Sequence, residues 1–422
     1  MNKKRNYLKL STLFFSLMLT MVFALSIPST SKAASLGKVT NLKQTYGSYD
    51  TDAGKYYIDV EYTPISSAYC YLAQISTDNK NWSFVKEYST NNVLSIGNST
   101  SLTANKVYYL RIIPATYSGN YDEADASNSI QVITAPANVS GDVIETTAKT
   151  NSITASWSAA TGATSYDVYV KKYGDSEYLL VGSTKSTSYK ITKYNGKKLA
   201  ADTPYYVSIC ATKTSTAGFK AEAVPTYGYP LYTLPSKTSK IVADDWKPGT
   251  ASLKIVWSGS YVADGYEVQF YNAKNKSLKK ATTTKNYYTL SKAPKNSFCS
   301  VKVRPFIKNA KGKKIYSDWS KKTYFISQAN MSNKKYTIGY GRLTINWSKV
   351  KGASNYVVYA GTSSSKMKKV ATVSSNTTSY TLTKISGSTV SRYGTYYVKV
   401  VPQKKVSGKT YKGDYGYYYI VR

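Results

Sequence analysis

The sequence predicts an all-β protein in which four β-sandwiches follow one another along the chain. Three observations predict this class. Apolar and polar residues alternate with a period of two through many short segments, which is typical of half-buried strands. One pattern of aromatic residues recurs along the chain, and no segment after the N-terminal region shows a sustained apolar period of 3.6 residues. The chain has 422 residues, enough for three to four domains of about 100–150 residues each.

The N-terminal region, residues 1–33, predicts a secretory signal peptide. Four cations precede an apolar run over residues 10–27, which Pro28 ends. Ser31 and Ala33 are small residues at the −3 and −1 positions of a cleavage site before Ala34. The alternative is an uncleaved membrane anchor, since an apolar run of 18 residues is at the lower limit of the length that can span a bilayer. We expect a mature chain that is secreted, or retained at the cell wall.

The repeated element is an aromatic pair with a fixed spacing. In three places a Trp ends one alternating segment and a Tyr begins the next, nine residues later. A fourth, earlier copy has Tyr in place of Trp. The pairs are Tyr62 with Tyr71, Trp157 with Tyr166, Trp257 with Tyr266 and Trp347 with Tyr356, at intervals of 95, 100 and 90 residues. Self-similarity at such a period predicts a tandem array of one domain type, with the three Trp side chains in the cores.

The limits of the repeats follow from the segments that close them. ITAP at 133–136 and YTLP at 232–235 each end one unit with a proline, and the third junction, near 325–330, is placed by the period alone. The predicted repeats are therefore 35–135, 136–234, 235–327 and 328–422.

A second pattern carries a resemblance to a known family. Leu102 precedes Tyr108 by six residues, as Leu199 precedes Tyr205, and Val390 takes the Leu position before Tyr396. This pattern, with the Trp on the second strand, resembles the tyrosine corner of fibronectin type III repeats. The resemblance covers nearly all of the chain after residue 34 and implies immunoglobulin-like sandwiches. The third repeat departs from it, since Ala293 and Cys299 stand at the two corner positions, and a corner hydrogen bond is not expected there.

Composition removes most catalytic chemistry. The chain contains no histidine, so triads, dyads and zinc sites that need an imidazole are excluded. Its three cysteines, Cys70, Cys210 and Cys299, fall in different repeats, so we expect them to be unpaired and buried. The acidic segments 50–54 and 122–125 do not complete a calcium-loop spacing. We therefore expect no enzyme, no catalytic residue, no cofactor and no metal site. Sparse cysteine use suits a secreted bacterial protein.

Charge is distributed unevenly between the repeats. The formal charge of the whole chain is +35, and the four predicted repeats carry −2, +3, +14 and +15 in chain order. Because so many like charges repel one another, a polyanion is the expected partner of the last two repeats.

Clusters of lysine indicate where a polyanion would bind. They fall in three predicted hairpins of the third and fourth repeats: Lys274, Lys276, Lys279 and Lys280; Lys308, Lys311, Lys313 and Lys314; and Lys404, Lys405, Lys409 and Lys412. Only five arginines lie beyond the signal segment, which favours a diffuse electrostatic surface over a shaped pocket. The alternative is that these lysines simply keep edge strands soluble.

Tyrosine is the other abundant surface-forming residue, with 44 copies. Most are expected to pack the sheets. Paired tyrosines such as Tyr205 and Tyr206 are expected to direct one ring outwards, because neighbouring side chains alternate faces. Tyr411 and Tyr415, in the last basic hairpin, form a candidate aromatic platform.

These observations favour a secreted, non-catalytic binding or adhesion protein. Its basic C-terminal repeats would dock on an anionic cell-wall polymer or glycan, and the first two repeats would face a protein partner. Two alternatives remain open: a module that binds neutral polysaccharide, alone or beside an enzyme, through exposed tyrosines, and a passive spacer.

Overall fold

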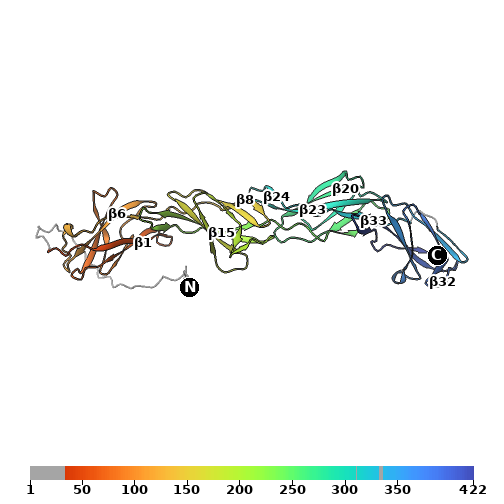
Figure 1. Cartoon of the computed structure of the whole chain (residues 1–422), viewed down its shortest axis with the longest axis horizontal. Coiled ribbons are helices and arrows are strands. Elements are labelled where there is room, and N and C mark those ends of the chain that lie inside the picture. The colour runs from red at the N-terminus through yellow and green to blue at the C-terminus, as the bar shows by residue number, and fades with distance from the viewer. Residues whose placement is uncertain (1–33, 310, 332–335) are drawn as a thin grey trace. The chain divides into compact units, whose positions relative to one another are not determined.

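The computed structural model describes residues 34–309, 311–331 and 336–422. Within these ranges the chain forms strands β1 to β35 and two single-turn 3-10 helices, η1 (Glu123–Asp125) and η2 (Ser364–Lys366) (Figure 1). The paired strands of the described sheets run antiparallel. The predicted signal peptide lies outside the described residues. The chain has the predicted architecture of tandem immunoglobulin-like sandwiches.

The second, third and fourth repeats each combine a three-stranded sheet with a five-stranded sheet. In the second repeat the three-stranded sheet consists of β12 (Ser188–Ile191), β9 (Ser152–Ser156) and β8 (Ile144–Lys149). The five-stranded sheet consists of β11 (Leu179–Thr184), β10 (Ser165–Lys172), β15 (Pro204–Thr214), β16 (Lys220–Glu222) and β17 (Tyr229–Tyr232). A small hairpin, β13 (Lys193–Tyr194) with β14 (Lys197–Lys198), precedes β15.

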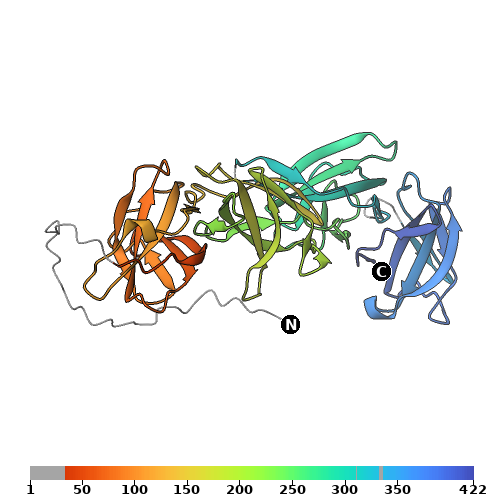
Figure 2. The ribbon, with the colours of Figure 1, turned by 60° about the vertical axis from the view of Figure 1, so that its left-hand side comes forward.

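The third and fourth repeats have the same strand order. In the third repeat the three-stranded sheet consists of β18 (Val242–Asp245), β19 (Leu253–Val256) and β22 (Tyr287–Leu290). The five-stranded sheet consists of β21 (Ser277–Thr283), β20 (Gly265–Tyr271), β23 (Phe298–Lys308), β24 (Lys314–Tyr316) and β25 (Thr323–Ile326). In the fourth repeat the strand order is β26 (Thr337–Gly339), β27 (Arg342–Asn346) and β30 (Ser379–Leu382), and β29 (Lys368–Ser374), β28 (Asn355–Gly361), β33 (Tyr396–Val406), β34 (Lys409–Lys412) and β35 (Tyr419–Val421), with the hairpin β31 (Lys384–Ile385) and β32 (Ser388–Thr389) (Figure 2).

The first repeat has a three-stranded sheet, β1 (Thr40–Asp50), β2 (Lys55–Thr63) and β5 (Val93–Ile96). Its second sheet has four strands, β4 (Ser83–Ser89), β3 (Cys70–Ser76), β6 (Val107–Ala115) and β7 (Ile130–Ile133). The chain divides into two compact units, a smaller one that includes Val60–Leu94 and Tyr109–Ile130, and a larger one that includes Gln131–Arg422. Each described sheet draws its strands from one predicted repeat, and we retain the predicted limits as the proposed boundaries of the repeats.

An aromatic pair lies in each repeat at the positions that the sequence repeat marked. The ring centroids of Trp157 and Tyr166 are 5.5 Å apart, and the other two Trp–Tyr pairs are at 5.3 and 5.6 Å. In the first repeat Tyr62 takes the Trp position, with its ring 4.9 Å from that of Tyr71. The three Trp side chains belong to the buried clusters of their repeats, so their predicted core position is confirmed.

The second Tyr of each pair also fixes a turn. Its hydroxyl accepts a hydrogen bond from the backbone N–H six residues earlier in all four repeats: Ile65 to Tyr71 at 2.7 Å, Ala160 to Tyr166 at 3.0 Å, Ser260 to Tyr266 at 2.7 Å and Val350 to Tyr356 at 2.8 Å. The turn that connects the two sheets is thereby tied to the strand that follows it. The sequence marked these tyrosines only as the second member of each aromatic pair, whereas their hydrogen bonds come from the structure.

The predicted tyrosine corner forms where its tyrosine is present. The hydroxyls of Tyr108, Tyr205 and Tyr396 accept from the backbone N–H five residues earlier, at 3.1, 2.8 and 2.8 Å. In the third repeat both partners of this bond are replaced, since Cys299 has no hydroxyl and Pro294 has no N–H. Replacing both partners leaves no buried polar group unpaired, so the departure costs little stability. Cys299 is fully buried, and burial raises the pKa of its thiol to about 12.

The three cysteines are free and buried, as predicted. The tyrosine pairs are less exposed than expected: Tyr206 is half-buried beside the buried Tyr205, and Tyr287 and Tyr288 are both half-buried. Neighbouring side chains alternate faces, but the outward-facing rings lie against other side chains of the sheet, as Tyr206 does against Lys171.

Glu145, on β8, is a buried acid whose two carboxyl oxygens differ in their hydrogen bonding. Its Oε2 accepts a hydrogen bond from the Tyr232 backbone N–H at 2.9 Å, while its Oε1 has no partner among the described residues. Burial raises the pKa of this carboxyl to about 7. The group is therefore protonated in the folded state below neutral pH, although it would ionise at about pH 4.5 in the unfolded chain.

We predict that replacing Tyr205 by Phe lowers the free energy of unfolding of the second repeat by about 1–2 kcal/mol. The Ala200 N–H, which forms a partly buried hydrogen bond with this hydroxyl, then loses its acceptor. Hydrogen exchange of β15 peptides measures this change. Tyr173→Phe, which alters an exposed ring, is the control and should have no effect. Equal protection in Tyr205→Phe and wild type would contradict the role given to the corner.

We also predict that the second repeat loses stability as the pH rises from about 4.5 to 8. The raised pKa of Glu145 means that the folded state binds the proton more tightly, so its stabilising contribution is complete below the unfolded pKa and is lost as the pH passes the folded value. The shift corresponds to about 3 kcal/mol at most. Hydrogen exchange of β9 peptides at several pH values measures the slope, which Glu145→Gln should reduce. An unchanged slope would show that other groups cause it.

Candidate functional site

The twelve lysines predicted to bind a polyanion lie on three hairpins. One hairpin joins β20 to β21, another joins β23 to β24, and the last joins β33 to β34. Eleven of the twelve side chains are exposed, and Lys404 is half-buried because its ammonium lies 4.2 Å from the ring centroid of Phe298. The predicted placement on exposed hairpins is thus what the structure describes.

These hairpins do not form one patch. Within the third repeat, the register pairs Tyr271 with Ser300 at one end of the sheet and Gly265 with Phe306 at the other. The β20–β21 hairpin projects beyond the first end and the β23–β24 hairpin beyond the second, so about 25 Å of strand separates them. The lysines at 308–314 therefore belong to a different surface from those at 274–280.

The outer surface of the β21–β20–β23–β25 sheet joins the first group to lysines that clustering in the sequence did not identify. Gln269 pairs with Lys280 on one side and with Lys302 on the other. Next to this row, Lys322 donates a 2.6 Å hydrogen bond to Asn275 and lies 4.4 Å from the ring centroid of Tyr271. We call this surface the basic face and define it by five side chains: Lys274, Lys276, Lys280, Lys302 and Lys322.

The last hairpin of the fourth repeat lies beside the basic face. The ring of Tyr411, on β34, is 5.3 Å from that of Tyr324, which follows Lys322 on the β25 side of the sheet. Lys409 and Lys412 flank Tyr411 on β34, so they extend the positive surface. Tyr411 is half-buried by this contact rather than displayed as a free platform.

Tyr415 has a structural position at the same junction. Its hydroxyl donates a 2.8 Å hydrogen bond to the Ile326 carbonyl, and its ring centroid is 6.2 Å from that of the fully buried Trp246. Burial raises the pKa of this phenol well above its usual range. The ring thus packs against the core of the third repeat, a contact that no local sequence signal indicated.

One buried carboxylate balances part of the positive charge. Glu267, on β20, is 2.6 Å from the Arg304 guanidinium and 3.0 Å from the Lys280 ammonium. Arg304 in turn lies over the rings of Tyr316 and Trp319, at 4.0 and 4.4 Å. Of the five lysines of the basic face, all of them described, only Lys280 forms an ion pair. The remaining four ammonium groups are free of internal carboxylates.

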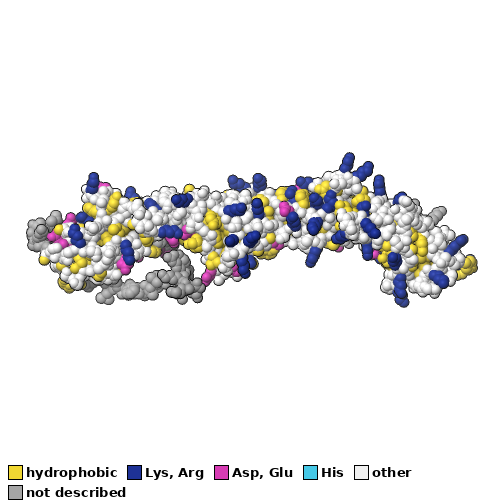
Figure 3. All heavy atoms as spheres, in the orientation of Figure 1, with side chains coloured by type: hydrophobic (Ala, Val, Ile, Leu, Met, Phe, Trp, Pro, Cys, Tyr) yellow, Lys and Arg dark blue, Asp and Glu magenta, His cyan; other side chains and the backbone are white. Residues whose placement is uncertain are grey.

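The surface view agrees with the charge gradient of the sequence. In Figure 3, Lys and Arg side chains project along the third and fourth repeats, where Asp and Glu side chains are sparse. The carboxylates in view gather mainly over the first and second repeats.

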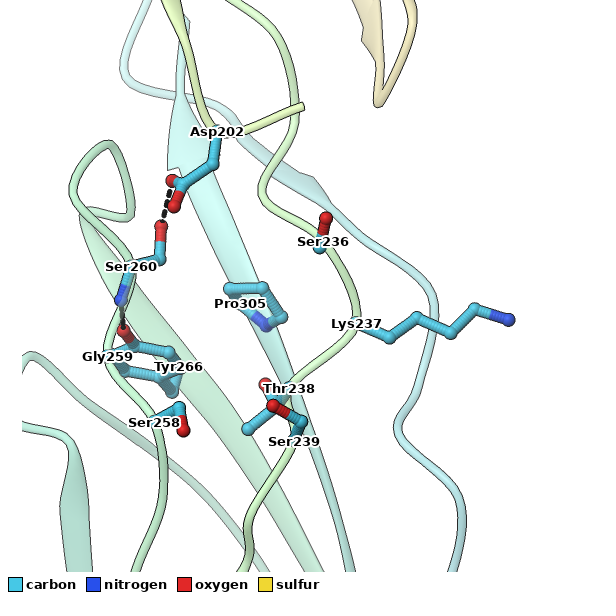
Figure 4. Close-up of a pocket in the computed structure, with 10 residues that line it drawn as sticks. All are labelled: Asp202, Ser236, Lys237, Thr238, Ser239, Ser258, Gly259, Ser260, Tyr266 and Pro305. Carbon is cyan, nitrogen blue, oxygen red and sulfur yellow. Dashed lines mark hydrogen bonds between the residues drawn. The ribbon is translucent and has the colours of Figure 1, made fainter. Parts of the chain in front are cut away.

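A small cavity of about 100 Å³ lies elsewhere, beside the linker that enters the third repeat (Figure 4). Hydroxyl groups of Ser236, Thr238, Ser239 and Ser258 line it, and Lys237 points away from it. Asp202 at its rim accepts a 2.5 Å hydrogen bond from the Ser260 hydroxyl. The volume suits a few water molecules and contains none of the predicted site residues.

In the acidic segments considered as calcium loops, two aspartates accept hydrogen bonds from nearby backbone N–H and hydroxyl groups. Asp50 accepts from the N–H of Asp52 and of Ala53, and Asp125 accepts from the Ser35 hydroxyl and the Leu36 N–H. No group of three metal-binding side chains occurs among residues 34–309, 311–331 and 336–422. Over the same ranges, no helix has the length and apolar character needed to cross a membrane.

Exposed aromatic rings cluster in the smaller unit. Tyr69 and Tyr117 meet edge to face at 4.7 Å, although 51% and 80% of their surfaces are exposed. Phe84 and Tyr121 form a second exposed pair at 5.2 Å. Neither pair was identified from the sequence, because exposure of a ring depends on which loops cover it.

Comparisons with known proteins add little to this description. No protein-family model matches the chain, and no curated protein matches it. Among solved structures, the chain is similar to the crystal structure of the chicken CNTN1 FN1–FN3 domains, at 15% identity and a TM-score of 0.29, over 69% of this chain and 98% of that one.

We predict that Glu267→Gln lowers the free energy of unfolding of the third repeat by about 2 kcal/mol. The substitution leaves the partly buried Arg304 guanidinium without its carboxylate. Hydrogen exchange of β20 and β23 peptides measures the loss. Lys280→Gln, which removes the more exposed partner, is the control and should cost less than about 1 kcal/mol. A larger loss in the control would contradict the importance given to Arg304.

Proposed function

We propose that this protein is a secreted, non-catalytic binding protein whose third and fourth repeats hold it on an anionic cell-wall polymer or glycan. The observation that carries the proposal is the basic face together with β34. It combines several exposed ammonium groups, of which Lys280 alone faces an internal carboxylate among the described residues. A flat surface of this kind suits a flexible polyanion better than a small ligand.

The chemistry of the groups also favours loose electrostatic docking. Lysine ammonium groups are point charges without fixed geometry, so they bind phosphate, sulfate or carboxylate groups without demanding one arrangement. The nearby rings of Tyr271 and Tyr324 add apolar area on which a sugar ring can pack. The first two repeats carry little net charge and would stay free for a protein partner.

We predict that the mature chain pellets with purified bacterial cell walls and that salt releases it. Counterion release makes such binding fall steeply over about 50 to 500 mM salt. A variant with four Lys→Gln substitutions should be released at a lower salt concentration, and its binding should depend less steeply on salt. The substituted residues are Lys274, Lys276, Lys302 and Lys322. Co-sedimentation at each salt concentration measures this.

The matched control removes the same number of charges from the other end of the same repeat. This control changes Lys308, Lys311, Lys313 and Lys314 to Gln, and it should change the salt concentration needed for release by less. Equal effects of the two variants would mean that net charge acts without a defined surface. Retention on a neutral polysaccharide without salt dependence would favour the exposed tyrosine pairs as the binding surface instead.

A further inference from the structure

At one end of each of the first three repeats, one residue forms a hydrogen bond with the repeat that follows. Its position lies three residues before the tyrosine-corner position, and it is occupied by Asn105, Asp202 and Asn296 in turn. All three residues have left-handed backbone conformations, with φ of 55°, 58° and 48°. Asn and Asp are the side-chain-bearing residues that adopt this conformation most readily. We call this the docking position.

Each of these residues bonds to the next repeat. The Lys213 ammonium donates to Asn105 Oδ1 at 2.7 Å, and the Ser260 hydroxyl donates to Asp202 Oδ1 at 2.5 Å. The Lys351 backbone N–H donates to the Asn296 carbonyl at 2.9 Å. A short polar residue in a left-handed conformation is therefore the common feature of the three junctions.

The fourth repeat has a different residue at the docking position. Tyr393 stands there, its backbone is not left-handed, and 76% of its surface is exposed. The preceding residue is Arg392, where the first two repeats have Ala104 and Ala201. This end of the fourth repeat therefore lacks the feature by which the other repeats receive a neighbour.

Arg392 joins Tyr393 to a second exposed ring. Its guanidinium carbon is 4.5 Å from the ring centroid of Tyr393 and 4.7 Å from that of Tyr340, which is 75% exposed, and it also donates a hydrogen bond to the Tyr393 hydroxyl. The turn that carries Tyr340 is held against the same loop by a 3.0 Å hydrogen bond from the Gly341 N–H to the Val390 carbonyl. One cation and two rings thus form a single exposed cluster.

No carboxylate of the residues that the structure describes neutralises this cluster. Asp414 is the only acid of the fourth repeat, and it pairs with Lys399 at 2.8 Å. Arg111 and Arg304, in the first and third repeats, pair with glutamates, whereas Arg342, Arg392 and Arg422 form no ion pair among the described residues. An arginine held between aromatic rings without an acid keeps its planar donors available for an external anion.

We propose that Tyr340, Arg392 and Tyr393 bind one unit of an anionic saccharide. The guanidinium would donate two parallel hydrogen bonds to the carboxylate or phosphate, and the exposed rings would pack against the adjoining sugar. A further repeat or a second copy is disfavoured by the loss of the docking residue. Single-stranded nucleic acid is disfavoured because its binding uses successive ring platforms, whereas both rings here contact one guanidinium. The occupant is of the class in the proposed function, but the residues are separate from the basic face.

The test is calorimetric titration of the mature full-length chain with two probes, a galacturonate trisaccharide for the carboxylate and a glycerol-phosphate oligomer for the phosphate. The expected result is binding of at least one probe, weakened about tenfold by Arg392→Lys, which keeps the charge but removes the planar fork. Tyr393→Asn should weaken binding similarly. Lys349→Ala, which removes a charge from the loop near the third repeat, is the matched control and should leave the affinity within about twofold.

Four results would overturn the proposal. They are failure of both probes to bind, equal affinity of Arg392→Lys and wild type, tighter binding of an oligodeoxynucleotide with the same dependence on Arg392, and self-association in sedimentation that Tyr393→Asn abolishes. The substituted side chains are exposed, so the variants should retain the hydrogen exchange of the core strands. In the four-lysine variant of the basic face, Arg392→Lys should weaken the remaining binding of the probes by the same factor, so this test succeeds or fails independently of cell-wall docking.

Discussion

The hydroxyl of one tyrosine in each repeat sets the geometry on which the rest of the repeat depends. Tyr71, Tyr166, Tyr266 and Tyr356 each pack against an aromatic ring from the neighbouring strand and accept a backbone N–H from the turn between the two strands. The aromatic contact supplies buried apolar area, and the hydrogen bond satisfies a buried or partly buried donor that would otherwise lack a partner. Together they fix where the strand that begins the larger sheet starts.

Because this interaction is internal to each repeat, the outer surfaces can vary without loss of the fold. The third repeat has no tyrosine corner, because Pro294 and Cys299 replace the donor and the acceptor of its hydrogen bond, yet its core remains closed around Trp257 and Tyr266. The same independence allows the charge to change from −2 in the first repeat to +15 in the fourth. A fold of this kind does not by itself specify a function, so the outer surfaces and loops are where the repeats differ in what they can bind.

The lysines acquire different roles according to their neighbours. Lys280 balances the buried Glu267, and Lys404 covers the ring of Phe298, so both contribute to packing. Lys302, on β23, and Lys322, just before β25, share the basic face with Lys280 on β21. The electrostatic surface is therefore produced by strand register, since cross-strand neighbours are brought within a few ångströms.

The sequence alone determined the fold class, the buried tryptophans and the three tyrosine corners that form, because period-two alternation and fixed spacing are local consequences of strand geometry. It also located the exposed lysine hairpins. Only the tertiary structure decided that Lys308 and Lys274 lie at opposite ends of one sheet, that Tyr415 packs on Trp246, and that Arg392 lies over both Tyr340 and Tyr393. Each of these depends on contacts between segments that are far apart along the chain, and spacing within a segment carries no information about them.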